Sequence, residues 1–473
     1  MPLTTLLRDS RALATLAVPL ILTQLAQVAL TTTDTVMMGA LGPADLAAGG
    51  LAIVIFNQLR TMGVGLVTSV GNQIAGASAR AETAQDTNAS ARAEQDGQHE
   101  VRRIVRASLA VATLAGVAGA ALMLLIGQAL TFLGQEADVV SRAQAMLLAL
   151  APGLLPCLWF QAIRQFTVGM RRPQALLQIT IASVAVNAGI NWALIHGTWG
   201  LPKLGLPGIG VATSLVYLLS FLALYLAAKK DTVLGPLLTL NITKADRATV
   251  RRLLQLGVPI AATYGSEAGF FSVTALMAGT FGSAALAAHT AINQLVAIVF
   301  QVAVGLSHAA SINVSRELAL ERPQTALRIK NTALACAGAV MLIVGIVYAT
   351  LPRLVLSPFF DTSNARDAQA VSIATHLLLV IMVLQFFDCA QNIGVGLLRG
   401  LDDTKSGFRI TLIGYWLIGL PAAWLLGYAA GLHTLGIWLG LLTGLATTAV
   451  LLLRRYTVAL RARFHTPEAV PAT

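Results

Sequence analysis

Three carboxylates interrupt stretches of the sequence that are otherwise apolar: Asp34, Glu267 and Asp388. An ionisable side chain at membrane depth is costly, so it usually faces a cavity and takes part in transport. Burial opposes ionisation, and two buried carboxylates that lie close together titrate as a coupled pair. Such groups could hold a proton or a sodium ion. A structural hydrogen bond between helices is the alternative reading that remains open for each of them.

Polar residues accompany each carboxylate at helical spacing and therefore share its helix face. The companions are Gln24, Gln27 and Thr31 near Asp34, Tyr264 and Thr274 near Glu267, and Gln385, Gln391 and Asn392 near Asp388, with Asn187 and Asn191 one turn apart in another apolar stretch. Polar stripes can hold membrane helices together. Three stripes that are each centred on a carboxylate favour the wall of a wet cavity instead.

The elements that position these residues must be membrane spans. Hydrophobic residues make up 56% of the 473-residue chain and charged residues only 11%, too few to cover a soluble protein of this size. A span needs about 20 mostly apolar residues. This length predicts twelve transmembrane helices, at 12–40, 46–75, 104–133, 143–169, 174–197, 206–228, 253–280, 284–312, 329–352, 370–398, 407–430 and 434–453.

The positive charges predict the orientation of these spans. Only Arg142, Lys203, Arg353 and Arg366 fall in the loops on one side, and Arg60 and Arg164 fall inside spans. The remaining 26 of the 32 Lys and Arg residues lie on the side of the two termini. Because cytoplasmic loops collect Lys and Arg, we expect both termini in the cytoplasm and the chain in the inner (plasma) membrane of the cell.

An internal repeat predicts the architecture. Leu16–Ile53 aligns without a gap on Leu256–Asn293, with eleven of 38 pairs identical. The expected fold is therefore an all-α integral membrane protein with twelve helices in two pseudo-symmetric six-helix lobes, 1–235 and 236–473, around a central cleft. The segment 76–100 is low in complexity and has no apolar period, which predicts a mobile cytoplasmic loop.

The repeat does not reproduce the carboxylates. Glu267 aligns with Gln27, and Asp34 aligns with Thr274, so we expect the ion site to lie mainly in the C-terminal lobe. The repeat does align two prolines inside predicted helices. Proline kinks can act as hinges or only shape helix packing, and both interpretations stay open for these two residues: Pro19 and Pro259.

The sequence resembles the multidrug and toxic compound extrusion (MATE) transporters, specifically their NorM-type branch, over nearly its whole length. The stretches that carry the resemblance are VPLILTQLAQVALTTTDTVMMGALG from residue 18, VNAGINWALIHGTWGLPKLGLPGIGVATS from residue 186, LGVPIAATYGSEAGFFSVTALMAGTFGSAALAAH from residue 256 and LQFFDCAQNIGVGLLRGLDDTKSGF from residue 384. The long segment 76–100 and the mid-span Arg60 depart from what we expect of that family.

The resemblance implies cation-driven export of drug-like cations. It implies that Glu267 and Asp388 are the cation-coupling carboxylates, that Asp34 is functional in the N-terminal lobe, and that Asn187 and Asn191 line the cavity of that lobe. The sequence does not distinguish Na⁺ from H⁺ as the coupling ion. The carboxylate pair could bind either ion, with Asn and Gln oxygens nearby for sodium.

The predicted mechanism is secondary active antiport by alternating access. A cation entering from outside would displace an organic cation held by the same carboxylates and by aromatic rings. The rings that could contact such a substrate are Phe270, Phe271, Phe386 and Phe387. We expect small organic cations, drugs and the lipid bilayer as partners of a monomeric chain.

Two other functions are less compatible with the sequence. A flippase for lipid-linked precursors should line its cleft with Arg and Lys, whereas away from their ends the predicted spans contain only Arg60, Arg164 and three acids. A membrane-embedded enzyme would need a nucleophile–base pair or a metal cluster, and neither pattern occurs. The Gly-rich stretch before the sixth span lacks the context of a phosphate loop. We therefore expect no nucleotide, nucleic acid or resident cofactor.

Overall fold

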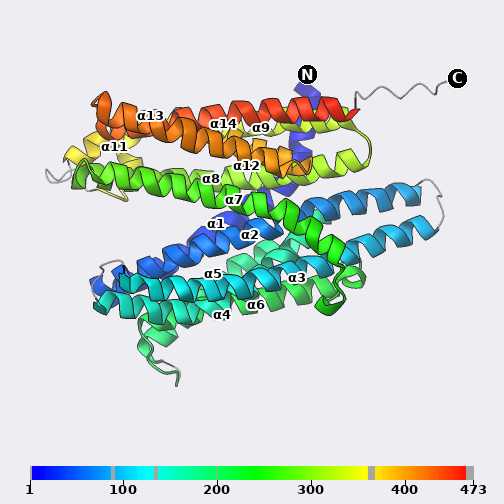
Figure 1. The fold of residues 1–473 in the computed structure, drawn as a ribbon, viewed down its shortest axis with the longest axis horizontal. Helices are drawn as coiled ribbons and strands as arrows, with labels where there is room; N and C mark the ends of the chain where they lie inside the picture. Colours follow the sequence, from blue (N-terminus) through cyan, green and yellow to red (C-terminus); the bar gives the residue numbers. More distant parts are fainter. Residues whose placement is uncertain (1–2, 87–90, 133–136, 199, 361–367, 465–473) are drawn as a thin grey trace. The chain divides into compact units, whose positions relative to one another are not determined.

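The computed structural model describes residues 3–86, 91–132, 137–198, 200–360 and 368–464, and every regular element within these ranges is helical (Figure 1). The long helices are α1 (Leu3–Leu41), α2 (Pro43–Asp86), α3 (Ala91–Ala129), α4 (Ala137–Gly169), α5 (Gln174–His196), α6 (Leu206–Lys230), α7 (Arg247–Gly279), α8 (Ser283–Ala319), α9 (Pro323–Thr350), α11 (Ala368–Gly400) and α14 (His433–Phe464). Shorter elements are η1 (Leu130–Phe132), η2 (Gly235–Leu237), η3 (Ile242–Lys244), α10 (Pro352–Leu356), α12 (Thr404–Leu412), η4 (Ile413–Gly419), α13 (Leu420–Trp424) and η5 (Leu425–Ala429).

Eleven helical segments in the described part of the chain are long and apolar enough to cross a membrane. They correspond to eleven of the twelve predicted spans, with α12 to η5 forming one continuous segment, Thr404–Ala429. The one remaining predicted span, 253–280, corresponds to helix α7. The polar stretch from Tyr264 to Glu267 interrupts its apolar sequence. The prediction of an all-α, multi-pass membrane protein is confirmed.

The prediction of a mobile loop at 76–100 was wrong. Helix α2 continues to Asp86 and α3 begins at Ala91, so only 87–90 lie outside the described residues. A Cβ atom on Gly97 would lie 2.5 Å from the Cβ of Ala81, which means that the two helices touch closely here. Ala, Gln, Glu and Arg are strong helix formers. The contact is made by the small residues Ala81 and Gly97. A periodic pattern of large apolar residues, which would predict a packed helix from sequence, is therefore absent.

The helices form two compact units. We call Leu22–Gly265 the Asp34 unit, and Met1–Ile21 together with Ser266–Thr473 the Glu267 unit. Helices α1 and α7 each contribute to both units. The expected lobes, 1–235 and 236–473, rest on the sequence repeat and stay a prediction.

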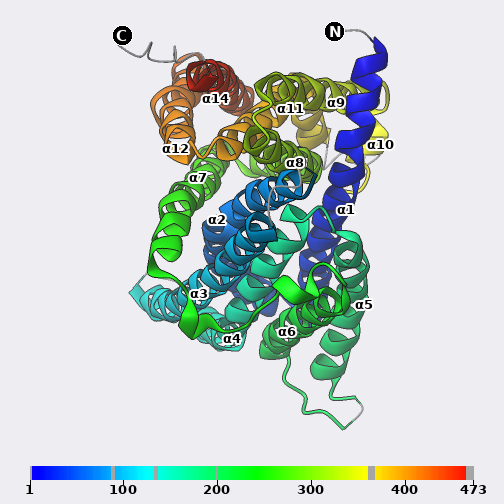
Figure 2. The ribbon, with the colours of Figure 1, turned by 90° about the vertical axis from the view of Figure 1, so that its right-hand side faces the viewer.

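Helix α4 forms the centre of the Asp34 unit, where it contacts α2, α3 and α6 (Figure 2). In its most apolar stretch 72% of the residues are buried, the highest share among the candidate spans of the described chain. The Ser214 hydroxyl on α6 donates a hydrogen bond to the Ala149 carbonyl on α4 at 2.7 Å. Small residues and hydroxyls of this kind let membrane helices approach closely.

Helix α11 plays the same part in the Glu267 unit, where it contacts α8, α9 and α14. The Ser307 hydroxyl on α8 donates to the Asn392 carbonyl on α11 at 2.7 Å. Two π-helical segments, η4 and η5, lie against α14. Short π-helical segments occur often at functional sites, and η4 contributes Tyr415 to the candidate site described below.

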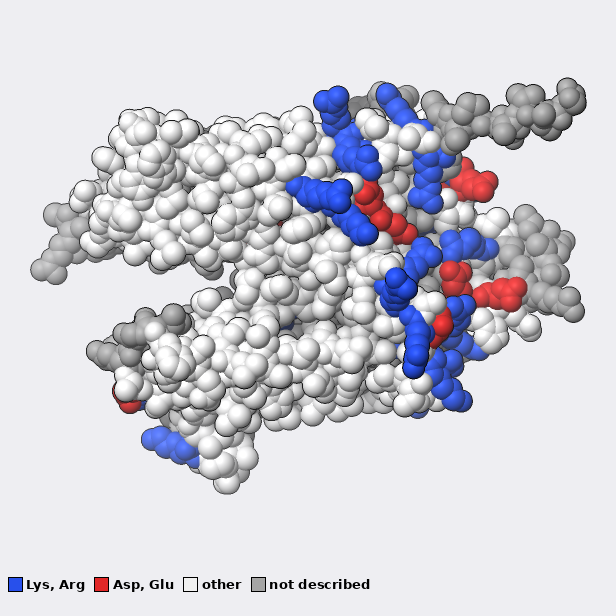
Figure 3. Space-filling model, viewed as in Figure 1, with Lys and Arg blue, Asp and Glu red and all other residues white. Residues whose placement is uncertain are grey.

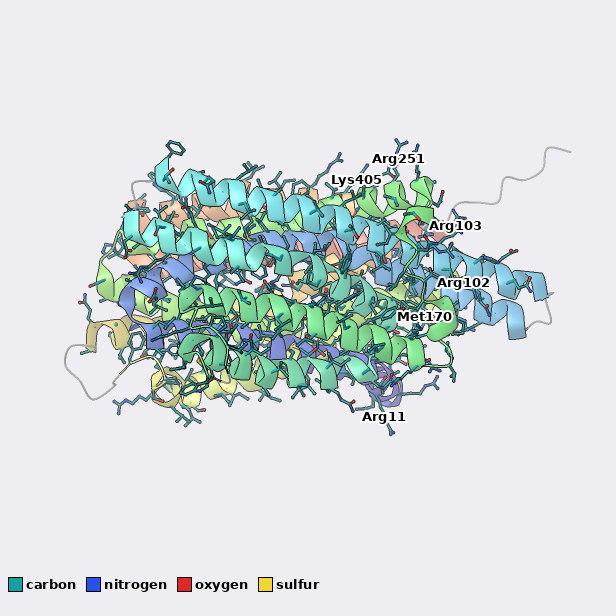
Figure 4. All side chains as sticks on the ribbon, turned by 90° about the horizontal axis from the view of Figure 1, so that it is seen from below. Arg11, Arg102, Arg103, Met170, Arg251 and Lys405 are labelled. Carbon is teal, nitrogen blue, oxygen red and sulfur yellow. The ribbon has the colours of Figure 1, made fainter. Side chains whose placement is uncertain are left out.

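The basic residues gather toward one end of the helices within each unit, on the face drawn in Figure 3. In the Asp34 unit, Arg102, Arg103 and Arg251 lie toward the end at which α4 finishes, near Met170 (Figure 4). This one-sided distribution within each unit agrees with the pattern of charge that the sequence predicts.

Two carboxylates tie down the segment between α6 and α7. Asp231 pairs with Arg172 at 2.9 Å, and Asp246 pairs with Arg103 at 2.7 Å. Desolvation raises the pKa of Asp231, but hydrogen bonds from the backbone of Leu234 and Val233 and from Arg172 together lower it below its usual value. Hydrogen bonds from Thr249, Arg103 and the Thr249 backbone lower the pKa of Asp246.

Candidate functional site

Asp34 lies in a dense hydrogen-bond network inside the Asp34 unit. Its side chain is only 4% exposed. Asn187 and Asn191 on α5 each donate an amide hydrogen to its Oδ1 atom, at 2.7 and 2.8 Å, and the Thr213 hydroxyl on α6 donates to its Oδ2 atom at 2.9 Å. Three helices therefore meet at one carboxylate, and all three contacts are of normal or short length.

The spacing of the two asparagines explains why both can reach the same oxygen. They are four residues apart on α5 and so project from one face of the helix. Within the described residues, neither of their amide oxygens has a hydrogen-bond partner. Asp34 thus accepts three hydrogen bonds, while Asn187 and Asn191 retain free acceptor atoms for a ligand or a water molecule.

A cavity lies in the same unit, with walls from α1, α2, α4, α5 and α6. Its lining residues are Gln27, Leu30, Thr31, Arg60, Phe160, Thr180, Ser183, Tyr217 and Ser220. Gln27 and Thr31, which the sequence analysis placed on a cavity wall, lie there together with Arg60. Their role in transport stays a prediction.

Glu267 occupies a contrasting position in the Glu267 unit. It is 8% exposed, and its Oε1 atom lies 3.5 Å from the Gln391 amide nitrogen and 3.4 Å from the Tyr415 hydroxyl. The Tyr415 hydroxyl also donates to the Gln391 Oε1 atom at 2.5 Å. The Tyr415 hydroxyl has one hydrogen to donate, and its shorter contact is the one to Gln391. Glu267 therefore keeps only two long, weak contacts, with the Gln391 amide and the Tyr415 hydroxyl.

Asp388 belongs to the same unit but lies on α11, whereas Glu267 lies on α7. Its side chain is 3% exposed. Its Oδ1 atom accepts a hydrogen bond from the Asn392 amide at 3.2 Å. The two carboxyl groups are close enough to interact electrostatically. Phe270 stacks on Tyr415 with ring centroids 5.0 Å apart, so an aromatic ring lies beside the side chain that contacts Glu267. The structure thus brings together Glu267, Asp388 and two of the predicted amide side chains.

The other predicted residues of this region lie in more varied places. Gln385 is 2% exposed and donates to Tyr348 at 3.4 Å, and Thr274 is fully buried. Phe386 is 37% exposed, so it does not share the buried face of Gln385 and Asp388. Phe271 and Phe387 are half-buried. Tyr264 belongs to the Asp34 unit although it shares α7 with Glu267.

Pro19 and Pro259 lie inside α1 and α7 without ending either helix. These are the two helices that contribute to both compact units, and each passes from one unit to the other shortly after its proline, at Ile21 and Gly265. Their role as hinges stays a prediction.

Two residues of the candidate site were not predicted from the sequence: Thr213 and Tyr415. Each is a hydroxyl residue within an apolar helix, and no carboxylate or amide side chain on the same helix marks it. Hydroxyl residues are common in membrane helices as packing contacts, so their type alone carries little information. Only the fold reveals that one contacts Asp34 and the other lies between Glu267 and Gln391.

No group of three or more His, Cys, Asp or Glu side chains that could hold a metal ion occurs among the residues that the structure describes. A sodium site at Glu267 and Asp388 would therefore have to use amide, hydroxyl or backbone oxygens as well. Hard cations such as sodium accept oxygen ligands of these kinds, and Gln391, Asn392 and Tyr415 supply them nearby.

A family model described as MatE matches residues 19–193 and 259–425. The chain belongs to the MatE family. The two matched ranges begin at Pro19 and Pro259, which the internal repeat aligns with each other. The family predicted from the sequence is thereby confirmed, and with it the prediction of a membrane transporter rather than an enzyme.

Curated relatives match this MatE chain over most of its length. It is 34% identical over 444 residues to a "Probable multidrug resistance protein NorM" of Pseudomonas aeruginosa, covering 93% of this chain and 88% of the relative. It is 35% identical over 447 residues to a protein of the same name in Bradyrhizobium diazoefficiens, covering 94% and 92%. These matches agree with the predicted NorM-type branch.

Solved structures share the fold of this MatE chain. One is a MATE protein in complex with MaL6, with a TM-score of 0.84, 17% identity and 96% of both chains covered. Another is an outward-facing multidrug resistance MATE family transporter of the MOP superfamily, with a TM-score of 0.82, 17% identity and the same coverage. At such low identities the likeness concerns the fold alone.

Proposed function

We propose that this protein is a secondary active multidrug exporter that exchanges organic cations and drugs for Na⁺ or H⁺ by alternating access. The observation that carries the proposal is the pair of buried carboxyl side chains, Glu267 and Asp388. Both side chains are buried at membrane depth, interact electrostatically and have few hydrogen-bond donors. Membership of the MatE family and the names of the NorM relatives support the same activity.

The chemistry of the group explains how ion and drug can exclude each other. Two carboxyl groups in a site of low dielectric constant are unfavourable when both are ionised and uncompensated. A proton, a sodium ion or the positive charge of a drug can each relieve this repulsion. One cation therefore competes with another, and the inward ion gradient drives the drug outward.

Asp34 would contribute to substrate binding rather than to ion coupling. Three donors already stabilise its charge, whereas Glu267 has only two long contacts, so Asp34 gains less from a bound cation. We further propose that the chain acts as a monomer in the inner membrane of the cell with both termini in the cytoplasm. The one-sided distribution of Lys and Arg supports this orientation.

The decisive experiment is reconstitution of the purified protein into liposomes. Ethidium movement would be followed while an inward Na⁺ gradient and an inward H⁺ gradient are imposed separately, with protein-free liposomes as the control. We expect one of the gradients to drive ethidium export. If the reconstituted protein moved ethidium equally with and without either gradient, the proposal of cation-coupled export would be refuted.

A further inference from the structure

Two basic side chains come together where α9 meets α14 in the Glu267 unit (Figure 1). Lys330 lies on α9 and is half-buried, Arg461 lies near the end of α14, and the two charges interact electrostatically. Among the residues that the structure describes, no salt bridge includes either side chain. Two cations held close together repel each other, so an anion bound between them would be stabilised by both.

Hydrogen bonds hold the two helices together at this place. The Tyr456 hydroxyl on α14 donates to the Ala326 carbonyl on α9 at 2.8 Å, and the Tyr456 side chain is fully buried. Lys330 lies one turn after Ala326, and its Nζ atom donates to the Thr457 hydroxyl oxygen at 3.2 Å. We call this place the α9–α14 junction, formed by these four residues and Arg461. It holds the lysine ammonium group beside α14 in a defined position.

The adjoining face of α14 is basic at one end and apolar further along. Arg454, Thr457 and Arg461 are spaced by three and four residues and therefore share this face. Both arginines are exposed. Val450, one turn before Arg454 and toward the middle of the helix, is 60% exposed, and Val458 is 52% exposed. A phospholipid presents a charged headgroup followed by an apolar acyl chain in the same order.

Neighbouring arginines at this end of the unit differ from the junction because they have acidic partners. Arg455, the next residue after Arg454, pairs with Asp403 at 2.8 Å. Arg328 on α9 pairs with Asp9 on α1. The carboxylates of this end are therefore engaged with other arginines, and the charges of the junction need an anion from outside the chain.

We propose that the α9–α14 junction binds the phosphate of an anionic phospholipid, with Lys330 and Arg461 as the principal contacts. Basic pockets between membrane helices bind anionic headgroups in this way. A free phosphate carries the same chemical group, but the exposed valines beside the basic residues favour a lipid. The inference goes beyond the proposed export function, because it concerns neither the drug nor the coupling ion.

The test compares two lipids that differ in net charge. Purified full-length protein in an uncharged detergent would be titrated with dioctanoyl phosphatidylglycerol and with dioctanoyl phosphatidylcholine. Native mass spectrometry would count the bound lipid molecules and give both affinities. We expect the wild-type protein to bind phosphatidylglycerol about tenfold more tightly, because two basic contacts favour the lipid with net negative charge. Equal affinities would overturn the inference.

Variants assign this preference to the junction. Lys330→Gln and Arg461→Gln should each weaken phosphatidylglycerol binding by about fivefold and leave phosphatidylcholine binding unchanged. Lys405→Gln is the matched control, because Lys405 is an exposed lysine on α12 of the same unit and the substitution removes the same charge. An equal loss in Lys405→Gln would indicate attraction by total charge alone. That result, or wild-type affinity in both junction variants, would overturn the inference.

The hydroxyl group and a conservative variant separate charge from packing. Thr457→Val removes the oxygen that accepts from Lys330 but no charge, so it should keep most of the preference. If Thr457→Val abolished the preference while Arg461→Gln kept it, the inference would be overturned. Should Lys330→Gln fail to fold, Lys330→Arg takes its place: it retains the charge and should retain the preference, and its loss in this folded variant would contradict the proposal.

A final arm distinguishes a lipid from a free phosphate. Glycerol 3-phosphate carries the phosphate group without acyl chains. We expect it to displace phosphatidylglycerol only at a concentration at least tenfold above that of the lipid, because it lacks the apolar contact with the exposed valines. Displacement at equal concentration would overturn the assignment to a lipid.

Discussion

Asp34 and Glu267 are both buried carboxylates on long membrane helices, yet their surroundings differ sharply. Asp34 accepts three hydrogen bonds of 2.7 to 2.9 Å from two helices. Glu267 has two contacts of 3.4 and 3.5 Å, one of them from a hydroxyl that is already engaged with Gln391. A second carboxylate, Asp388, adds repulsion on that side and has no counterpart beside Asp34.

The difference indicates a division of labour. Short hydrogen bonds stabilise a charged acceptor, so the network holds the Asp34 carboxyl group in a fixed geometry. The Glu267 and Asp388 group lacks such compensation and gains most when a cation arrives. Asp34 is therefore suited to shape a binding cavity, whereas the pair is suited to bind and release the coupling ion.

The largest expected effect follows from neutralising the pair. Glu267→Gln and Asp388→Asn should each reduce cation-driven ethidium export by about tenfold or more, because drug and ion binding then lose their electrostatic coupling. The dependence of drug binding on pH or Na⁺ should flatten in both variants. Because the two groups act as one unit, the double variant should be hardly worse than either single variant.

Transport in proteoliposomes and equilibrium drug binding in detergent would measure these effects. Asp138→Asn is the matched control, because Asp138 is an exposed carboxylate paired with Arg142. Strictly additive losses would indicate two independent roles. Wild-type export in either single variant would remove that residue from the coupling mechanism.

A smaller and different effect is expected at Asp34. Asp34→Asn can keep most of the network, since its oxygen can still accept from Asn187 and Asn191 while its new amide donates to the Thr213 oxygen. Export should fall, but the pH or Na⁺ dependence of drug binding should persist because Glu267 and Asp388 are unchanged. If that dependence disappeared instead, the proposed division of labour would be wrong.

Removing one hydroxyl from each site compares their hydrogen bonds directly. Thr213→Val takes a donor from a charged acceptor and should cost about 1.5–3 kcal/mol of stability, whereas Tyr415→Phe breaks a neutral contact and should cost about 0.5–1.5 kcal/mol. Tyr415→Phe also keeps the ring stack on Phe270. Thermal unfolding in one detergent would rank the variants, with Thr213→Ser as the control that keeps the hydroxyl. The reverse ranking would contradict the comparison.

The carboxylates themselves could be predicted from the sequence because an acid within an apolar run is costly and therefore rare. Asn187 and Asn191 could be predicted as a pair because their spacing places them on one helix face. Their convergence on Asp34 could not, because it depends on how α1 packs against α5 within the fold. The same holds for the electrostatic contact between Glu267 and Asp388 on different helices.

The failures of prediction share a physical cause. Thr213 and Tyr415 are hydroxyl residues, which cost little in a membrane helix and so leave no signal in an apolar sequence. The segment 76–100 was misjudged because its helices touch through Ala and Gly rather than through large apolar side chains. Arg60 was visible in the sequence, but only the structure reveals that it lines a cavity together with Gln27 and Thr31.

The smallest expected effect concerns Asp246, which provides an exposed reference for Asp34. It accepts hydrogen bonds from the Thr249 backbone, the Thr249 hydroxyl and Arg103, yet it lies outside the membrane helices. Water can replace these donors, so Asp246→Asn should lower the unfolding temperature less than Thr213→Val does. A larger decrease would mean that donor number alone, without burial, governs the stability of such networks.

The pH dependence of that small effect has a definite sign. Because its hydrogen bonds lower the folded-state pKa of Asp246, the carboxylate stabilises the fold fully above the unfolded-state pKa of about 3.9. This stabilisation is lost as the pH falls through the lower, folded-state pKa. The difference in unfolding temperature between wild type and Asp246→Asn should therefore stay constant from about pH 7 to pH 5 and shrink only below about pH 4. A difference that vanished between pH 7 and pH 5 would show that another group is responsible.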